Sequence, residues 1–484
     1  MIFTVLLVHA IVRPNVIYIM ADDLGYGELG CYGQTKIKTP NINQLAAEGM
    51  KFTQFYAPST VCAPTRCSLL TGKHQGHAAI RGNTEQGGFG PNDLEGQTPL
   101  PKSETTIAEM LKQVGYRTGI VGKWGLGGPN PGETPNDHGF DFFYGYLCQR
   151  RAHNHFPPYL WKNHQPDLLN NPVYDAHQKA TSVPDDLNEY NKLYGGKNYA
   201  GTKLMENCID FIKTSKSQPF FLYYAPTIPH AALQAPVDWI EKYPRDWDPK
   251  PYLGENGYLP NPRPRATYAA MISYLDYTVG EIRKTLVASG QDQNTLIVFT
   301  SDNGATFNGG VDRAFFGSNG IYRGAKMSLY EGGFREPFIA WYPKAIRAGS
   351  SCATPFAGYD TMASLAELCG AKTPKSDGTS YAKELTGGQG AKRDYLYFEY
   401  PEASSQRAIV FGRMKAIQPD LKKKPGLIEL YDLVNDPSEA HDLSGSMPEL
   451  TAKAKAIFLK EHVPNKTFPL PGVDPVKLKV PVKG

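Results

Sequence analysis

Short, mostly apolar runs recur along the chain, and each ends abruptly in a turn that carries polar residues. The runs occupy residues 15–20, 117–121, 220–224 and 295–300. Near-continuous apolar strands of this kind are buried on both faces, as in parallel sheets that helices cover on either side. Helical patterns lie between and after them, at residues 103–114, 201–213, 268–289 and 359–369. The alternation predicts an α/β fold with a large mixed, mostly parallel sheet sandwiched by helices.

The polar turns are candidates for a common site. They are Ala21-Asp22-Asp23, Gly122-Lys123-Trp124, Ala225 to His230 and Ser301-Asp302-Asn303-Gly304. In open α/β sheets, ligands bind outside the carboxyl ends of the strands. Because all four turns follow strand ends, we expect one pocket to collect them. Two long aperiodic stretches, 125–200 and 240–266, are expected to form ordered loops that cover this pocket.

The pattern changes after about residue 380. Three short strand-like runs at 395–400, 408–418 and 427–433 precede a helical pattern at 448–461. This order predicts a smaller C-terminal subdomain with an antiparallel sheet and one packing helix. We therefore expect a catalytic domain over residues 13–380 and a subdomain over 381–484.

The N-terminus and the composition bear on location. Residues 1–12 form a short apolar run without basic residues, which we interpret as the remnant of a signal peptide of a periplasmic or secreted protein, although an early core strand also fits. A net charge of +4 over 484 residues gives no case for nucleic-acid binding. No apolar run reaches the roughly 20 residues of a membrane span. Seven cysteines without CxxC pairs leave at least one outside any disulfide set.

One cysteine stands out by its neighbours. Cys62 precedes Pro64 and Arg66. Proline suits the first turn of a helix, because its missing N–H is not needed there. Cys62 is then expected just ahead of a helix N-terminus, where the helix dipole favours an anion, with Arg66 reaching back toward it. Taken alone, the pattern also fits a buried structural cysteine.

Other segments place this cysteine in a family context. Cys62-Ala-Pro-Thr-Arg66, followed by Leu69-Leu-Thr-Gly72, resembles the signature of the formylglycine-dependent sulfatases, an arylsulfatase-like family of the alkaline phosphatase superfamily. Further segments of this chain also resemble segments of that family, namely residues 21–27, 115–124, 227–230, 301–304, 324–335 and 430–437. The resemblance covers most of the chain, in the family's order.

The resemblance implies a sulfuric ester hydrolase. A formylglycine-generating enzyme would oxidise Cys62 to Cα-formylglycine, whose hydrate offers two hydroxyls. One would attack sulfur and displace the alcohol, and loss of the other's proton would expel sulfate. Lys123 and Lys326 would contact the sulfate oxygens, and His230 would protonate the leaving oxygen. Arg66 would hold the hydrate. The alternatives are that Arg66 only caps a helix end and that His230 only caps a group near it.

A metal site is expected at two of the strand ends. Asp22, Asp23, Asp302 and Asn303 offer only oxygen ligands, a set that suits Ca²⁺ first and Mg²⁺ second. The resemblance adds the modified Cys62 to these ligands. Such a metal can lower the pKa of the nucleophile and hold a sulfate oxygen.

The chain departs from the family at one position. Many members have a histidine two residues after the signature lysine, where it deprotonates the second hydroxyl; here Gly125 follows Lys123 and Trp124. Another base is then needed. His74, His77 and the histidines at 153–155 are the candidates, and the sequence does not decide between them.

The substrate is expected to be a sulfated carbohydrate, with arylsulfatase activity on model esters. The loop after the signature lysine supplies Gln149, Arg150, His153 and His155 as candidate substrate-binding residues, with Tyr159 and Trp161 nearby. Sugars need fixed hydrogen-bond groups and aromatic faces, and this loop has both. Its alternative role is a packed aromatic cover on the sheet.

Two other functions stay open at this point. A related phosphoesterase would use Ser or Thr as nucleophile and commonly two metals with histidine ligands, which the sequence does not favour. A sulfatase-like binding protein that lacks catalysis is the other alternative, because Gly125 replaces the usual histidine. The complete Cys62 motif and the four metal ligands argue against it.

Overall fold

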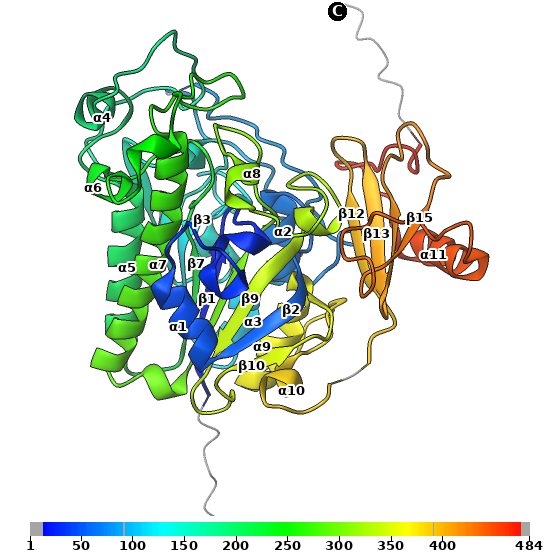
Figure 1. Cartoon of the computed structure of the whole chain (residues 1–484). Helices are drawn as coiled ribbons and strands as arrows, with labels where there is room; N and C mark the ends of the chain where they lie inside the picture. Colours follow the sequence, from blue (N-terminus) through cyan, green and yellow to red (C-terminus); the bar gives the residue numbers. More distant parts are fainter. Residues whose placement is uncertain (1–12, 91, 391, 476–484) are drawn as a thin grey trace, which may run out of the picture.

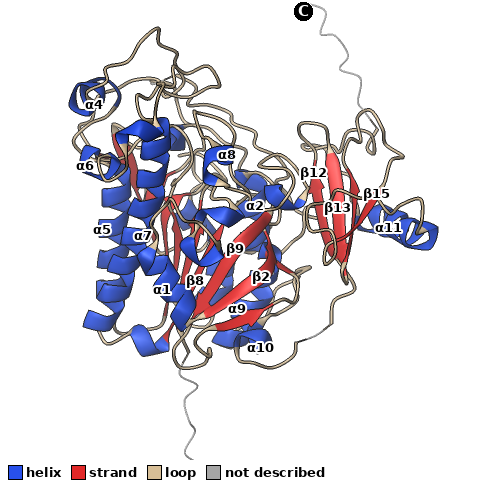
Figure 2. Cartoon of the chain, viewed as in Figure 1, coloured by secondary structure: helices blue, strands red, loops and turns tan. Residues whose placement is uncertain are grey.

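The computed structural model describes residues 13–90, 92–390 and 392–475, so the predicted signal peptide at 1–12 lies outside the described residues. A large mixed sheet lies between two layers of helices, and a smaller sheet stands beside it with one helix on its outer face (Figures 1 and 2). The expected fold class is confirmed.

The large sheet is built around parallel strands. Its strands are β1 (Asn15–Ala21), β2 (Met50–Tyr56), β3 (Arg117–Lys123), β4 (Phe142–Tyr146), β5 (Tyr159–Lys162), β6 (Gln165–Leu168), β7 (Phe220–Ala225), β8 (Thr295–Ser301), β9 (Arg335–Trp341), β10 (Ser350–Cys352) and β11 (Phe356–Ala357). They lie in the order β10-β2-β9-β8-β1-β7-β3-β4-β5-β6, with β11 paired to β2. The central neighbours β8, β1, β7 and β3 run parallel, whereas β9, β5 and β6 pair antiparallel.

Helices cover both faces of this sheet. The α-helices of the described residues are α1 (Pro40–Glu48), α2 (Cys62–Thr71), α3 (Ile107–Lys112), α4 (Leu187–Tyr194), α5 (Ala200–Thr214), α6 (Val237–Ile240), α7 (Pro264–Ala288), α8 (Arg313–Phe316), α9 (Thr361–Cys369), α10 (Ala382–Leu385) and α11 (Pro448–Glu461). Ile17 and Ile19 of β1 pack in the core with α1, α5 and α7, and Val16 and Tyr18 pack in the core with α2, α3 and α9. Since side chains alternate across a strand, burial on both faces explains the unbroken apolar run.

The smaller sheet has four antiparallel strands, one more than the sequence pattern predicted. They are β12 (Leu396–Tyr400), β13 (Gln406–Phe411), β14 (Met414–Gln418) and β15 (Glu429–Asp432). The predicted single run at 408–418 is a hairpin, because the chain turns at Gly412, whose φ of 59° is in the left-handed region that favours glycine.

This sheet packs on the larger one through an apolar face. Phe398 and Tyr400 of β12 share a core with Tyr56, Val61 and Phe334, which lie next to the ends of β2, α2 and β9. The opposite face packs on Ile457 and Phe458 of α11. The C-terminal strands are therefore anchored beside the start of α2, where Cys62 lies.

Several predicted boundaries shift in the structure. The expected helix at 103–114 is limited to Ile107–Lys112, and the one at 268–289 begins earlier, at Pro264. Helix α2 starts at Cys62 itself rather than after it, with Pro64 in the first turn. Strands β2 and β9 had no sequence prediction.

Two further findings concern membranes and thiols. Within the described ranges, no helix is both long enough and apolar enough to cross a bilayer. All seven cysteines are free thiols, and six of them are buried.

We predict that His462 stabilises the C-terminal subdomain mainly in its charged form. Its Nδ1 lies 2.7 Å from Glu399 Oε1 and its Nε2 lies 2.8 Å from Asp474 Oδ1. Burial opposes the charge, but the two carboxylates together raise the pKa of His462. A raised pKa stabilises the fold below the unfolded pKa of about 6.5, and this contribution is lost as the pH rises through the folded pKa. The melting-temperature difference between wild type and His462→Ala should thus be larger at pH 5.5 than at pH 9.

His441→Ala provides the control, because His441 is exposed. A difference between wild type and His462→Ala that stays constant from pH 5.5 to pH 9 would contradict the prediction.

Candidate active site

The four parallel central strands bring the predicted polar turns to one edge of the sheet. Asp22 and Asp23 follow β1, Asp302 and Asn303 follow β8, Lys123 ends β3, and His230 lies five residues after β7. In the β1–β8 register Ala21 lies opposite Ser301, and the backbone N–H of Asp302 donates to the Ala21 carbonyl. The in-register parallel pairing therefore fixes the acidic turns side by side.

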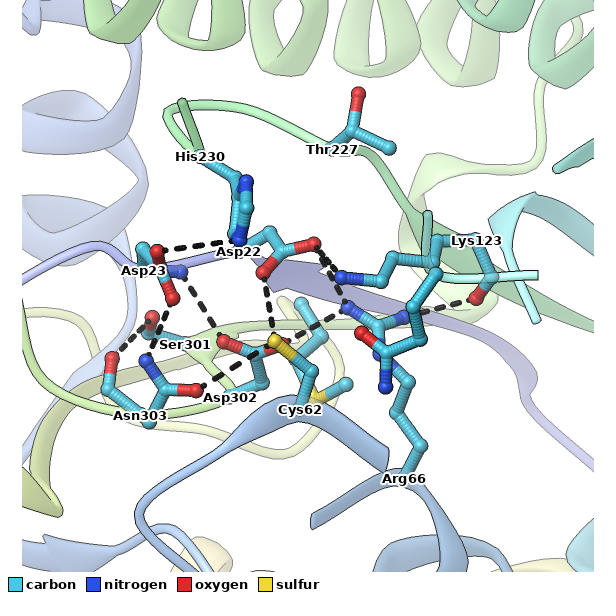
Figure 3. Close-up of polar contacts among 12 residues, drawn as sticks. Asp22, Asp23, Cys62, Arg66, Lys123, Thr227, His230, Ser301, Asp302 and Asn303 are labelled. Atoms are coloured by element: carbon cyan, nitrogen blue, oxygen red, sulfur yellow. Dashed lines mark hydrogen bonds and ion pairs between the residues drawn. The ribbon is translucent and has the colours of Figure 1, made fainter. Parts of the chain in front are cut away.

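Cys62 lies among these carboxylates (Figure 3). Its Sγ is 3.2 Å from Asp22 Oδ1 and 3.8 Å from both Asn303 Oδ1 and Lys326 Nζ. The thiol is 1% exposed. Burial, together with the charges of Asp22 and Asp302, raises the pKa of Cys62 well above its usual value. An unmodified cysteine here is therefore a protonated thiol and a poor nucleophile.

A residue from another segment caps the start of α2. Val61 provides no side-chain cap, and Asn83 Oδ1 instead accepts a hydrogen bond from the N–H of Ala63 at 2.9 Å. Gln149 Nε2 also donates to Asn83 Oδ1, at 3.1 Å. Asn83 thus connects the helix start that carries Cys62 to the loop that carries Gln149.

Arg66 crosslinks the carboxylates rather than reaching Cys62. Its Nη2 lies 2.9 Å from Asp302 Oδ2 and 3.4 Å from Asp22 Oδ2, and its Nη1 donates to the Lys123 carbonyl at 2.8 Å. Arg66, Asp22 and Asp302 are fully buried. This guanidinium ties α2, β1, β8 and β3 together beneath the site.

Both predicted lysines point into the same cluster. Lys123 Nζ lies 2.7 Å from Asp22 Oδ2, and Lys326 Nζ lies 2.7 Å from Asp23 Oδ1. Burial disfavours the charged ammonium groups, but Asp22 raises the pKa of Lys123 and Asp23 raises that of Lys326. Both lysines are therefore cations inside the site.

The donor set fits a hard cation. Asp22, Asp23 and Asp302 are buried carboxylates in one cluster, and Asn303 adds an amide oxygen. Burial and the charge of Asp22 raise the pKa of Asp302 to about 7, although Arg66 and Lys123 oppose this shift. Carboxylate and amide oxygens are the ligands that Ca²⁺ and Mg²⁺ prefer.

His230 is oriented by its backbone neighbours. Its Nδ1 donates to the Ala231 carbonyl, which directs Nε2 into the site, 3.6 Å from Asp23 Oδ2. Burial lowers the pKa of His230 to about 4 in spite of the nearby Asp23. A bound sulfate would add negative charge and favour the protonated ring.

The candidate substrate-binding residues divide into two groups. His153 stacks on His230 with ring centroids 4.8 Å apart, and His155 Nε2 bonds to the His230 carbonyl at 2.9 Å. These two histidines therefore buttress His230. Gln149 lies against Gly125, and the Arg150 guanidinium lies 5.7 Å from the Phe89 ring centre.

The backbone at Gly125 disfavours a histidine, because its φ of 69° is in the left-handed region. Space is not the obstacle, since a Cβ there would make ordinary contacts, 3.5 Å from Arg66 Cδ and from Gln149 Nε2. The neighbouring amide of Gln149 cannot take up a proton at neutral pH. His74 and His77, two of the candidate bases, lie elsewhere: His74 Nε2 contacts Glu461 at 3.1 Å and His77 Nδ1 contacts Asp377 at 3.0 Å.

Sequence reasoning missed two residues on the His230 side of the pocket. Tyr258 packs against His153, His177 and His230 with ring centroids 5.1, 4.6 and 5.7 Å apart, and His177 Nε2 lies 2.8 Å from His153 Nδ1. Tyr258 has a φ of 66°, an uncommon conformation for a bulky residue. Both residues come from the aperiodic stretches that were expected to cover the site, and nothing in the sequence singled out either one.

The comparisons with known proteins identify the family. The profile of the Sulfatase family matches residues 14–371, and a profile described as N-sulphoglucosamine sulphohydrolase, C-terminal, matches residues 317–461. The chain is 31% identical to an N-acetylgalactosamine-6-O-sulfatase of Bacteroides thetaiotaomicron, with 92% of each chain covered. It is also 31% identical to human arylsulfatase A, over 92% of this chain and 87% of the relative.

Solved structures show the same relationship. The crystal structure of Ps i-CgsB in complex with k-i-k-neocarrahexaose superposes with a TM-score of 0.75 at 27% identity, covering 93% of this chain and 94% of the other. The chain therefore belongs to the sulfatase family. It is a sulfuric ester hydrolase, the class of enzyme that the sequence resemblance implied.

Proposed function

We propose that the protein hydrolyses sulfate esters of carbohydrates, with Cα-formylglycine at position 62 and a calcium ion held by Asp22, Asp23, Asp302 and Asn303. The observation that carries the proposal is the convergence of Cys62, three carboxylates and two lysines in one buried cluster. Relatives named N-acetylgalactosamine-6-O-sulfatase and N-acetylgalactosamine-6-sulfatase, and a structural neighbour solved in complex with k-i-k-neocarrahexaose, support the carbohydrate substrate.

The two groups that maturation and metal binding would add have separate tasks. Formylglycine would supply an oxygen nucleophile where the thiol is held protonated. Calcium would supply positive charge next to the sulfate oxygens. The side chains of Asp22, Asp23, Asp302 and Asn303 would hold that ion, because they adjoin at neighbouring strand ends: Asn303 Nδ2 donates to Asp23 Oδ1, and the Asp23 N–H donates to Asp302 Oδ1.

The remaining residues bind charge and move a proton. Lys123 and Lys326 would shift from their carboxylates to the sulfate oxygens and compensate the charge that develops as the ester bond breaks. His230, fixed by the Ala231 carbonyl and by the stacked His153 ring, would donate its Nε2 proton to the leaving oxygen. Arg66 would keep Asp22 and Asp302 in place beneath the reacting groups.

The test of the proposed function is a substrate panel. Galactose, N-acetylgalactosamine and N-acetylglucosamine with sulfate at the 3-, 4- or 6-position should be assayed beside nitrophenyl sulfate. We expect at least one sugar sulfate to be hydrolysed. Arg150→Ala should reduce its kcat/KM by about tenfold and leave the aryl ester within about twofold, since a small leaving group does not reach the rim. Arg347→Ala is the control, because Arg347 is exposed. Turnover of the aryl ester alone would contradict a carbohydrate substrate.

We predict that active enzyme carries formylglycine at position 62. Mass spectrometry of the tryptic peptide should find the aldehyde in place of the thiol, and Cys62→Ala should reduce activity at least a thousandfold, because it removes the nucleophile. Cys208→Ala is the matched control: Cys208 is also buried, but it packs in α5. Full activity with an unmodified Cys62 peptide would overturn the assignment.

Calcium removal should both inactivate and destabilise the protein. A ligand that binds only the folded state stabilises it by about 2.7 kcal/mol at 100 times its Kd, so chelation should lower the melting temperature until calcium is restored. Asp302→Asn removes one charge from the site and should raise the calcium concentration needed for half-maximal stabilisation at least tenfold. Asp210→Asn, an exposed change in α5, should not. A zinc pair in the purified protein would favour a phosphoesterase instead.

The role of His230 should depend on the leaving group. A general acid matters most when the departing alcohol is a poor leaving group. His230→Ala is therefore expected to lower kcat for a sugar sulfate by about a hundredfold and kcat for nitrophenyl sulfate by less than tenfold. Equal losses on both esters would assign His230 to sulfate binding.

A further inference from the structure

The turn between β12 and β13 brings the C-terminal subdomain to the catalytic pocket. Glu402 lies in this turn, and its Oε1 accepts a hydrogen bond from the Asn83 N–H at 3.1 Å. Asn83 in turn accepts from the N–H of Ala63, the residue after Cys62. Asn83 therefore connects a carboxylate of the C-terminal subdomain to the start of α2, which carries Cys62.

The turn is built to hold Glu402 in this place. Ala403 and Ser405 have φ values of 48° and 59°, in the left-handed region that residues other than glycine seldom occupy. The Ser405 N–H donates to the Glu402 carbonyl at 2.8 Å, and its hydroxyl donates to the Pro471 carbonyl. On the other side, Gly82 makes room, because a Cβ there would lie 2.9 Å from Glu402 Oε1.

The same hairpin borders the lysine that faces Cys62. Gln406 Oε1 of β13 accepts from the Leu329 N–H, three residues after Lys326. Burial raises the pKa of Tyr400, and the charge of Lys326 is close enough to oppose this shift. A second carboxylate, Glu85, lies two residues after Asn83, where its backbone pairs with Gln97. Lys123 and Lys326 act on its charge, Glu85 acts on that of Glu402, and burial raises the pKa of both carboxyl groups.

The positive charges of the site are already engaged. Arg66, Lys123 and Lys326 contact Asp22, Asp23 and Asp302, and the proposed sulfate and metal would share them. On the rim, burial lowers the pKa of His153, and lowers that of His177 to about 4, so both rings are neutral at neutral pH. The Arg150 guanidinium lies 5.7 Å from the Phe89 ring centre, and its charge also acts on Glu85.

We propose that Glu402 is a specificity-determining residue, which together with Glu85 makes the pocket select a sugar whose only anionic group is the sulfate ester being cleaved. A second sulfate on a neighbouring hydroxyl would approach these carboxylates and be repelled. Uncharged hydroxyl or acetamide groups would meet a hydrogen-bond acceptor instead. This inference rests on the proposed carbohydrate sulfatase function and narrows its substrate class.

The test compares substrates that differ by one sulfate. N-acetylgalactosamine 4-sulfate, 6-sulfate and 4,6-disulfate should be assayed with wild type and with Glu402→Gln, which keeps the acceptor oxygen for Asn83 and removes the charge. We expect wild type to prefer the better monosulfate by at least tenfold in kcat/KM. Glu402→Gln should raise the ratio of kcat/KM for the disulfate to kcat/KM for the monosulfate by about tenfold.

Two controls separate charge selection from damage to the fold. Glu449→Gln removes the same charge from an exposed position at the start of α11, and it should not change the preference. Glu85→Gln should act in the same direction as Glu402→Gln, which keeps the proposal testable if Glu402→Gln does not fold.

The outcomes separate the proposed role of Glu402 from the proposed carbohydrate sulfatase function. If wild type cleaves sugar monosulfates but takes the disulfate equally well, or if neither substitution changes the ratio, then the role of Glu402 is refuted and the sulfatase function stands. If wild type cleaves no sugar sulfate, the proposed function itself fails.

Discussion

Three buried carboxylates paired with three cations, two of them fully buried, are the constraint on which the rest of the structure depends. Asp22, Asp23 and Asp302 cannot stay charged away from water unless they are paired, and a buried pair that loses one partner typically costs about 3–5 kcal/mol. Arg66, Lys123 and Lys326 provide the pairing here. Each cation comes from a different segment of the chain. The charge cluster therefore holds α2, β3 and the segment before β9 against the ends of β1 and β8.

Much of this arrangement could be predicted from the sequence, because it follows from strand ends. Apolar runs buried on both faces mark the central strands, and parallel neighbours in register place their carboxyl ends together. Asp22, Asp302, Lys123 and the His230 turn were expected in one pocket for that reason, and the structure brings them together. The predictions failed where local patterns are weak: β2 and β9 pair with partners far away in sequence, and the hairpin at Gly412 interrupts an otherwise continuous strand pattern.

The walls of the pocket were harder to predict than its base. Tyr258, Asn83 and Glu402 lie in loops and turns, where no periodicity marks the direction of a side chain. Their positions depend on tertiary contacts, such as the ring packing of Tyr258 on His153 and the hydrogen bond from Asn83 to Glu402. The same limit applies to His74 and His77, which lie near Cys62 in sequence but contact Asp377 and Glu461 instead.

The electrostatics of the cluster also explain why the chemistry of the site favours an oxygen nucleophile. A cysteine protease lowers the pKa of its thiol with a neighbouring cation, whereas here burial, Asp22 and Asp302 raise the pKa of Cys62. Lys326, at 3.8 Å from Sγ, is already paired with Asp23 and does not reverse this effect. The same carboxylates that disfavour a thiolate form an oxygen-rich site for a hard cation, which in turn favours an ionised oxygen beside it. One arrangement of charges thus makes the unmodified thiol inert, and it would suit the proposed formylglycine for attack on a sulfate ester.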